Sequence, residues 1–372
     1  NEILHMMTLG RGAFAGPEFV EKFRDNSFFI GSNVRGAVQE GYADYTPIFL
    51  SEIPALLRSP SFALAAALVS VTPPDKHGMC SLGVSVDVVK SALSAATLKI
   101  AQINKNMPRT FGNSFIPYKE FDYVVEADTQ LPESPPIAIS PEFEAIGRHV
   151  SSLIRDGSVL QMGIGGIPNA VLFNMHDKND LGIHTEMFSD GVVELYEAGV
   201  ITNKYNNLNP GKFIATFLIG TKRLYEFVNE NPIVDMRPAD YTNKITVAGQ
   251  INNLISINSA IQVDLFGQIC AETIGYQQYS GVGGQVDFVR AASLSSGGKS
   301  IIALPSTARN NTISRIVSRL DEGACVTTTR NDVQYVVTEY GIADLRGRTL
   351  RQRAQDLINI AHPDFRGQLM KE

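Results

Sequence analysis

The sequence predicts an α/β protein with mostly parallel strands. Short runs rich in β-branched residues alternate with longer helical stretches along the 372 residues, as expected when each strand is followed by a helix. Two segments, residues 158–172 and 182–195, each read as a strand, a turn and a helix in direct succession. The chain is longer than one hydrophobic core usually serves, so two domains are expected.

The first part of the chain carries several predicted elements. Residues 27–31, 97–103 and 122–125 have the apolar, β-rich composition of strands. Residues 33–41 predict a helix that ends at a glycine. Residues 63–71 form an apolar stretch, and the prolines that follow it predict a turn.

A proline-rich segment, residues 128–141, divides the chain. It holds four prolines and few large apolar side chains, and proline favours an extended linker because it lacks a backbone donor. We therefore expect one α/β domain over residues 1–135 and a second over residues 136–372.

Two helices are expected in the second part. Residues 142–156 have helical periodicity directly after the linker. Residues 350–360 have an amphipathic pattern, with apolar side chains on one face, and His362-Pro363 predicts the stop. The strand–helix alternation runs between them.

Composition narrows the function classes. The formal net charge is −6 and no basic stripe is visible, which argues against a nucleic-acid partner. Cys80, Cys270 and Cys325 are far apart and form no paired motif, so we expect reduced thiols and a cytoplasmic protein. No apolar run is long enough to span a bilayer, so no membrane association is expected. The chain opens without an initiator Met, and a preceding segment is expected to be missing.

The first segment that could carry chemistry is the glycine turn after the strand at 158–162. Glycines let a ligand approach the backbone, and the helix that follows offers free N–H groups to negative charge. Pro168 stands where a dinucleotide fingerprint needs its third glycine, which disfavours an NAD-dependent dehydrogenase. The alternative is a tight turn that binds nothing.

The second segment presents a carboxylate at a strand end. A short strand over residues 182–185 delivers Glu186 at its carboxyl end, and Ser189 or Asp190 can cap the helix that follows. Ligands in open α/β sheets bind outside the carboxyl ends of strands. The alternative is a surface glutamate that is favoured by the helix dipole.

Two further segments have the same features, a glycine-rich loop and a carboxylate at the end of a strand. Residues 280–284 hold three glycines, which predicts a loop that either approaches a ligand with its backbone N–H groups or is an ordinary connection. Glu339 ends an apolar strand and rivals Glu186 for a catalytic role. The alternative for Glu339 is an ion pair with Arg330, Arg346 or Arg348.

The remaining reactive residue types give weaker signals. None of the six histidines has the spacing of a metal site, so no metal is expected and His184 is interpreted as structural. The serine-hydrolase motif G-x-S-x-G does not occur, which counts against that enzyme class.

Taken together, these segments resemble the acetyl-CoA hydrolase/transferase family, which includes the 4-hydroxybutyrate and acetate CoA-transferases. The resemblance extends over nearly the whole chain, and its combination of motifs is specific although single motifs are not. It is carried by residues 33–54, 73–87, 163–171, 184–195, 257–268, 280–288, 336–347 and 360–366.

The resemblance implies two α/β domains of the CoA-transferase (NagB/RpiA-like) type with the active site between them. It implies that Glu186 forms a glutamyl-CoA thioester and that Glu339 is a supporting catalytic carboxylate. The residues implied to hold coenzyme A and the developing oxyanion are Gln161, Met162, Gly163, Ile164, Gly165, Gly166, Ile167, Ser280, Gly281, Gly283 and Gly284.

The implied reaction moves coenzyme A between an acyl-CoA and a small carboxylic acid of the acetate, butyrate or 4-hydroxybutyrate class. Coenzyme A is then a substrate, no cofactor is permanently bound, and a homo-oligomer such as a dimer is expected. The alternatives are an acetyl-CoA hydrolase with the same site, in which water intercepts the intermediate, and an acyl-CoA-binding protein with little turnover.

Overall fold

The computed structural model describes residues 1–372 and confirms the α/β class with mostly parallel strands. Its largest sheet has six strands in the order β11-β10-β16-β21-β25-β26, all parallel except the last, antiparallel pair. The bounds of these strands are β10 Val159–Met162, β11 Gly182–Ile183, β16 Leu254–Ser259, β21 Lys299–Ala303, β25 Tyr335–Thr338 and β26 Gly341–Asp344.

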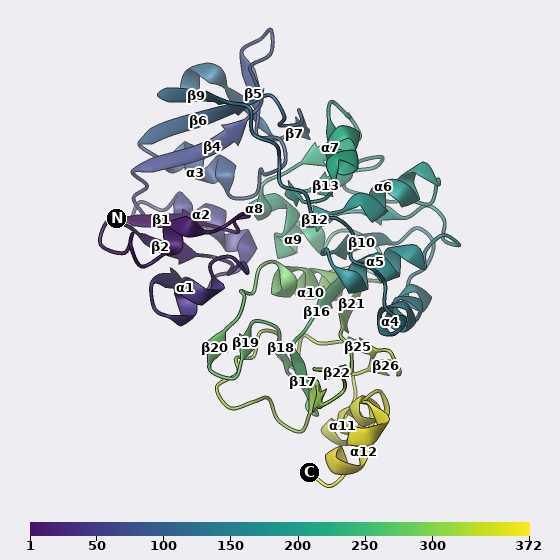
Figure 1. Ribbon diagram of the computed structural model, residues 1–372. Coiled ribbons are helices and arrows are strands. Elements are labelled where there is room, and N and C mark those ends of the chain that lie inside the picture. Colours follow the sequence, from purple (N-terminus) through teal and green to yellow (C-terminus); the bar gives the residue numbers. More distant parts are fainter.

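Two three-stranded parallel sheets form the first part of the chain, which is purple and blue in Figure 1. One contains β1 Glu2–His5, β2 Arg24–Ser27 and β3 Ala43–Tyr45. The other contains β4 Ala66–Val71, β6 Leu98–Asn104 and β9 Tyr123–Ala127. The strands expected at 97–103 and 122–125 are therefore confirmed.

The strand expected at residues 27–31 is wrong in position, because β2 ends at Ser27. Phe28 and Ile30 are apolar for another reason: they lie beyond the end of the strand, where both are buried in small hydrophobic clusters. The apolar residues from Phe28 to Ile30 therefore belong to the buried segment that follows the strand, and not to the strand itself.

Short strands join the two parts of the chain. β7 Phe111–Gly112 from the first part pairs with β15 Val234–Met236, which pairs with β13 Phe213–Ala215. Strands from the two sides of the expected domain division are therefore hydrogen-bonded to each other. The domain boundary at residues 135 and 136 stays a prediction.

Smaller strand pairs complete the fold. They are β5 Met79–Ser81 with β8 Phe115–Pro117, β12 Met187–Phe188 with β14 Phe217–Leu218, β17 Gln262–Asp264 with β18 Ile269–Cys270 and β24 Ile316–Val317, β19 Thr273–Ile274 with β20 Gln277–Gln278, and β22 Thr307–Ala308 with β23 Ile313–Ser314.

Helices cover the sheets, and most of the expected ones are present. They are α1 Arg35–Gln39, α2 Ile53–Leu57, α3 Val89–Ala95, α4 Pro141–Ser152, α5 Gly166–Phe173, α6 Asp190–Glu197, α7 Lys222–Val228, α8 Ala239–Thr242, α9 Ile245–Ala248, α10 Gln285–Leu294, α11 Leu350–Asn359 and α12 Pro363–Leu369. Short 3₁₀ turns occur at Ala13–Ala15, Leu50–Glu52 and Tyr118–Glu120. None of the helices is long and apolar enough to cross a bilayer.

The expected cap of α6 does not form. Ser189 is the N-cap residue but makes no capping hydrogen bond, and its hydroxyl has no partner. The carboxylate of Asp190 instead accepts hydrogen bonds from the amide (2.9 Å) and the hydroxyl (2.5 Å) of Thr221. At the other end of the chain, Pro363 both follows α11 and begins α12.

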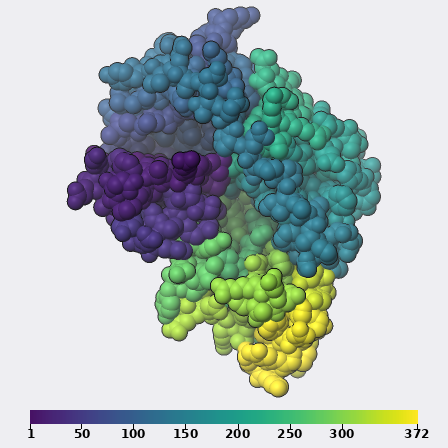
Figure 2. Space-filling model, in the orientation of Figure 1, coloured from purple at the N-terminus to yellow at the C-terminus, as the bar shows by residue number.

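The main core spans both parts of the chain. A cluster of 40 buried hydrophobic residues runs from Ala67 in β4 to Val337 in β25, so the first and second parts share one core. In Figure 2 the purple, teal and green parts of the chain meet near the middle of the face shown. The candidate site lies where these parts meet.

Candidate functional site

Glu186 lies in a bend between β11 and β12, at the carboxyl end of the short strand as predicted. Its backbone carbonyl accepts hydrogen bonds from the amides of Thr216 (2.9 Å) and Phe217 (3.1 Å). The hydroxyl of Thr185 accepts from the amide of Met162 at 3.2 Å and lies 2.8 Å from the Met162 carbonyl oxygen. The bend is thus fixed to the ends of two neighbouring strands.

The side chain of Asn243 donates a hydrogen bond to Oε2 of Glu186 over 3.0 Å. Asn243 is fully buried at the end of α8. The imidazole Nε2 of His184 lies 2.8 Å from the carbonyl oxygen of Thr242, the residue before Asn243. A carbonyl can only accept, so Nε2 carries the proton, and His184 is a structural residue that anchors α8 beside Glu186.

The glycine loop predicted at residues 280–284 packs directly on this carboxylate. A side chain added at Gly284 would overlap both Oε2 of Glu186 and the amide of Asn243. Gly283 has a positive φ of +53° and sits about 4 Å from Oε1 of Glu186, measured from the position a Cβ would take. Glycine is therefore required here both by backbone conformation and by close approach to the carboxylate.

Burial raises the pKa of Glu186 to about 7. The Asn243 amide and the Gly284 backbone N–H oppose this change because they stabilise the charged form, while the negative charges of Asp287 and Asp87 reinforce it. A carboxyl group with a pKa near neutrality, next to two hydrogen-bond donors, is an unusual and potentially reactive group.

Asp287 brings a second carboxyl, which is itself buried, into the same region. It accepts hydrogen bonds from the amide (3.1 Å) and hydroxyl (2.8 Å) of Ser51, and burial raises its pKa to about 7. The amide of Leu50 donates to the carbonyl of Gly283 over 3.1 Å. The turn at Leu50–Glu52, from the first part of the chain, therefore holds the glycine loop and α10 in place.

The outer side of the glycine loop is closed by Tyr45. A side chain at Gly281 would lie 3.2 Å from the Tyr45 ring, and the Tyr45 hydroxyl donates to Glu272 over 3.0 Å. The hydroxyl of Ser280 bonds only to the carbonyl of Gly281, at 3.4 Å. The loop is thus enclosed by residues from both parts of the chain.

The glycine turn at residues 163–167 borders a separate cavity of about 260 Å³. Ile164, Gly165, Gly166 and Ile167 line it at the start of α5, together with Arg315. Arg315 is partly buried and makes no side-chain hydrogen bond or ion pair within the chain, although the negative charge of Glu339 acts on it from nearby. The cavity therefore combines free helix N–H groups with a cation, a combination suited to an anion.

The two residues before the turn face the interior. The side-chain oxygen of Gln161 accepts hydrogen bonds from Ser256 (2.7 Å) and Asn258 (3.2 Å) within the sheet. Met162 is 1% exposed and belongs to the main core. Neither side chain lines the cavity, whereas Gly163 has open space around it.

Glu339 lies next to this cavity and is not hydrogen-bonded to the group around Glu186. It accepts hydrogen bonds from the amide (2.8 Å) and hydroxyl (2.5 Å) of Ser306, and its charge acts on Arg315. The alternative of an ion pair with one of three arginines is wrong. Those arginines contact Phe266, Ser293 and Asp356 instead.

Two residues at the site were not singled out as site residues in the sequence. Asn243 lies in a stretch without glycines or a strand pattern, so nothing in the sequence marks it. Asp287 lies inside a noted segment, but an acidic residue in the first turn of a helix is explained by the helix dipole alone. Only the burial of Asp287 and its contact with Ser51 indicate that it belongs to the site.

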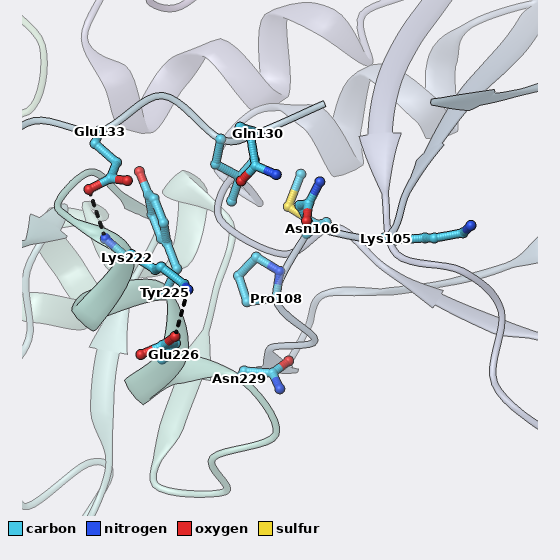
Figure 3. A pocket seen from close by; sticks show the side chains of 11 residues that line it. Lys105, Asn106, Pro108, Gln130, Glu133, Lys222, Tyr225, Glu226 and Asn229 are labelled. Carbon is cyan, nitrogen blue, oxygen red and sulfur yellow. Dashed lines mark hydrogen bonds and ion pairs between the residues drawn. The ribbon is translucent and has the colours of Figure 1, made fainter. Parts of the chain in front are cut away.

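A roomier cavity of about 300 Å³ lies elsewhere, between β6, the proline-rich linker and α7. Figure 3 shows Lys105, Asn106 and Gln130 on one side and Lys222, Tyr225 and Glu226 on the other. None of the predicted site residues lines it. No group of three or more His, Cys, Asp or Glu side chains that could hold a metal ion occurs in the chain.

Two family models match the chain. Residues 1–133 match the acetyl-CoA hydrolase/transferase N-terminal domain, and residues 220–372 match the C-terminal domain of the same family. Together they cover most of the sequence, on both sides of the glycine turn and Glu186.

Known proteins resemble the chain over its full length. It is 54% identical to the 4-hydroxybutyrate coenzyme A transferase of Clostridium kluyveri, over 100% of this chain and 86% of the relative. It is 48% identical to the succinyl-CoA:acetate/propanoyl-CoA:succinate CoA transferase of Fasciola hepatica, over 100% and 77%. The crystal structure of 4-hydroxybutyrate CoA-transferase from Porphyromonas gingivalis superposes with a TM-score of 0.83 at 39% identity, covering 100% of this chain and 92% of that one.

Proposed function

The chain belongs to the acetyl-CoA hydrolase/transferase family, and we propose that Glu186 is the covalent nucleophile of its reaction. The chain is a CoA-transferase, which moves coenzyme A between an acyl-CoA and a small carboxylic acid. Carboxylates of the acetate, butyrate and 4-hydroxybutyrate class are the proposed acceptors. The observation that carries the proposal is a partly buried Glu186 carboxyl held by Asn243 and covered by the glycine loop.

The proposed reaction begins with ionised Glu186. A carboxylate oxygen attacks the acyl carbon of the acyl-CoA, the carbon–sulfur bond breaks, and a mixed anhydride and CoA thiolate result. The thiolate then attacks the carboxyl carbon of Glu186, the anhydride carbon–oxygen bond breaks, and the first carboxylic acid leaves as its anion. A second carboxylate reverses these steps from the glutamyl-CoA thioester and leaves as the new acyl-CoA.

The donors around Glu186 have a clear task in this scheme. Each attack on its carboxyl carbon produces an oxyanion, and the Asn243 amide, which donates to Oε2, and the Gly284 N–H lie against this carboxyl group. Loss of one donor of this kind typically costs about 3 to 4 kcal/mol of transition-state stabilisation. Burial helps as well, because it removes water that would shield the carboxylate and hydrolyse the anhydride.

We propose that coenzyme A is a substrate only, with no permanently bound cofactor, and that its phosphates bind at the cavity beside α5. The turn at residues 163–167 would offer backbone N–H groups, and Arg315 would supply the positive charge. Glu339 would act from the side as a positioning residue, because it holds Ser306 and faces Arg315. Gln161 and Met162 would support the turn from within the sheet.

We infer that the enzyme is a cytoplasmic homo-oligomer, most simply a dimer. Cys80 and Cys270 are buried free thiols, which suits a reducing compartment. One face of the β4-β6-β9 sheet exposes an apolar row in which Leu68 pairs with Ile100 and Ile100 with Tyr123. Exposed apolar patches of this kind mark interaction surfaces. Light scattering should give twice the mass of the chain for the wild type and a lower mass for Leu68→Lys.

Trapping the intermediate tests the proposed nucleophile. The enzyme is incubated with acetyl-CoA, and the peptide that contains residue 186 is analysed by mass spectrometry and after borohydride reduction. We expect a CoA adduct on Glu186, no adduct and no exchange in Glu186→Ala, and a small residual exchange in Glu186→Asp. The control is Glu194→Gln, an exposed glutamate on α6, which should exchange normally. Near-normal exchange by Glu186→Ala would refute the assignment.

Kinetic measurements on the same enzyme distinguish transfer from hydrolysis. Ping-pong kinetics with two acyl substrates indicate transfer, whereas release of free coenzyme A without an acceptor acid indicates hydrolysis. Binding of acyl-CoA without either activity would leave an acyl-CoA-binding protein.

A further inference from the structure

Two of the three cysteines, which are far apart in the sequence, meet in the structure. Cys270 is buried in β18, and Cys325 is partly exposed in the segment between β24 and β25. Both sulfurs contact the hydroxyl of Thr273, which lies 3.2 Å from Cys270 Sγ and 3.6 Å from Cys325 Sγ. Cys80 lies apart from them, in β5 and in the main core. The chain therefore holds one pair of thiols and one isolated thiol.

Hydrogen bonds hold the two segments that carry this thiol pair against each other. The amides of Thr327 and Thr328 both donate to the carbonyl of Ile269, over 2.8 and 3.2 Å. The amide of Cys325 donates to the hydroxyl of Thr273 over 3.0 Å. Neighbouring segments fixed in this way keep the two sulfurs close together, which a disulfide requires.

The thiol pair is also more acidic than the isolated thiol. The hydrogen bond from Cys325 lowers the pKa of Cys270, whereas burial raises the pKa of Cys80 to about 11. Oxidants react with the thiolate form of cysteine, so the pair is the more reactive of the two sites.

The thiol pair lies at the start of the hairpin that leads into the glycine loop. This hairpin consists of β19 and β20, and Thr273 is its first residue. The carbonyl of Glu272, just before it, accepts hydrogen bonds from the amides of Tyr279 (2.8 Å) and Ser280 (3.1 Å). A displacement of Thr273 is therefore transmitted through Glu272 to the loop at residues 280–284.

A bond between the two sulfurs would cause such a displacement. In a disulfide the sulfurs are about 2 Å apart, which is closer than either sulfur lies to the Thr273 hydroxyl. The hydroxyl must then give up its contacts with the two thiols, and the start of the hairpin moves with it. The glycine loop packs on the Glu186 carboxyl with no room to spare, so a small shift of the loop disturbs that contact.

We propose that Cys270 and Cys325 are a redox-sensitive modification site, at which a peroxide forms a reversible disulfide that lowers CoA exchange by displacing the glycine loop. Disulfides in the cytoplasm are usually transient and catalytic or redox-sensing, so this site is consistent with thiols that are reduced in the resting enzyme. The formation of the disulfide does not depend on which residue is the nucleophile of the transfer reaction.

The oxidant in this scheme is hydrogen peroxide. The thiolate of the partly exposed Cys325 attacks one peroxide oxygen, the oxygen–oxygen bond breaks, and a sulfenic acid and hydroxide result. The thiolate of Cys270 then attacks the sulfenic sulfur, and the sulfur–oxygen bond breaks as a second hydroxide leaves. The two hydroxides take up the two thiol protons. The sulfurs lose two electrons in total, and the peroxide is reduced to two molecules of water.

Peptide mapping without reductant tests the bond. The reduced enzyme is treated with a small excess of hydrogen peroxide, the remaining thiols are blocked with iodoacetamide, and the chain is digested. We expect the peptides that contain Cys270 and Cys325 to be linked, with a mass two hydrogens below their sum, and Cys80 to be blocked. Absence of the linked pair would overturn the proposal.

Exchange assays on the same samples test the effect of the bond. We expect exchange by the oxidised wild type to fall about tenfold or more and to return when dithiothreitol is added, because a shift of about 1 Å at a catalytic group is costly. Cys325→Ser should have normal exchange before the treatment and keep it afterwards. Cys325→Ala gives the same comparison without a hydroxyl. Full exchange by the linked enzyme, or equal inactivation of the Cys325 variants, would contradict the switch.

Cys80→Ala is the matched control, because it removes the isolated thiol and leaves the pair. It should form the link and lose exchange as the wild type does; protection by this variant would identify Cys80 as the target and overturn the proposal. The peptide map needs no catalysis, so failure to find a CoA adduct on Glu186 would refute the proposed nucleophile and leave this test intact.

Discussion

The amide nitrogen of Asn243 lies 3.0 Å from Oε2 of Glu186, although 57 residues separate the two in the chain. Glu186 reaches this point from the sheet and Asn243 from the end of α8, which His184 anchors through the Thr242 carbonyl. The glycine loop covers the pair so closely that no side chain fits at Gly284. The predictions below all concern this small group of contacts.

Removal of the Asn243 amide should impair the nucleophile. Its hydrogen bond stabilises ionised Glu186, so Asn243→Ala should raise the pKa of Glu186 above its present value of about 7. We expect kcat/KM at pH 7 to fall at least tenfold, and the acid limb of its pH profile to move to higher pH. The pH profile distinguishes this from simple loss of folded enzyme, which would lower the curve without moving it.

Removal of the negative charge of Asp287 should shift the pH profile of kcat/KM in the opposite direction. The negative charge of Asp287 helps to raise the pKa of Glu186, so Asp287→Asn should lower that pKa and move the acid limb to lower pH. Asparagine keeps an oxygen that can accept from Ser51, so the turn at Leu50–Glu52 should stay in place. Asp364→Asn, a largely exposed position on α12, is the control for the pH profile. An unshifted limb in Asp287→Asn would contradict the electrostatic coupling.

A methyl group at Gly284 should abolish turnover. Gly284→Ala would force apart the Glu186 carboxylate and the Asn243 amide, and we expect exchange to fall at least 100-fold. Gly367→Ala is the matched control, because that glycine lies in α12 with open space around it. Full activity in Gly284→Ala would show that the close contact has no catalytic importance.

The pH dependence of stability should report on His184. Burial lowers its pKa to about 4, so the unfolded state binds more protons than the folded state between pH 6.5 and 4. The stability that neutral His184 contributes is therefore complete above pH 6.5 and is lost as the pH falls through this window, by about 3 kcal/mol.

Urea denaturation of His184→Phe at several pH values checks this. The raised pKa values of Glu186 and Asp287 give the opposite slope, because buried acids favour the folded state below their folded pKa and lose that contribution as pH rises toward 7. Both acids are present in the wild type and in the variant, so their contribution cancels in the comparison. The difference in unfolding free energy between wild type and variant should shrink toward pH 4, because only the wild type loses the contribution of neutral His184. His176→Phe, an exposed position, should show a constant difference.

The sequence determined the parts of this site that depend on local patterns. A glycine cluster, a carboxylate at the end of a short strand and a strand–turn–helix unit follow from the conformational preferences of neighbouring residues. They made Glu186 and the loop at 280–284 candidates, and the family resemblance supplied their expected roles. The strand near residue 27 was misplaced by three residues, because apolar side chains after a strand are buried as well as those within it.

Only the tertiary structure decided which of these parts meet. It placed the loop at 280–284 on Glu186 and placed Glu339 with Ser306 and Arg315 at a different cavity. It also supplied Asn243, Asp287 and Asp87, whose side chains act through burial and through contacts distant in sequence. Desolvation and hydrogen bonding across the fold have no local signature, so the reactivity of one glutamate among 38 acidic residues is a property of the assembled chain.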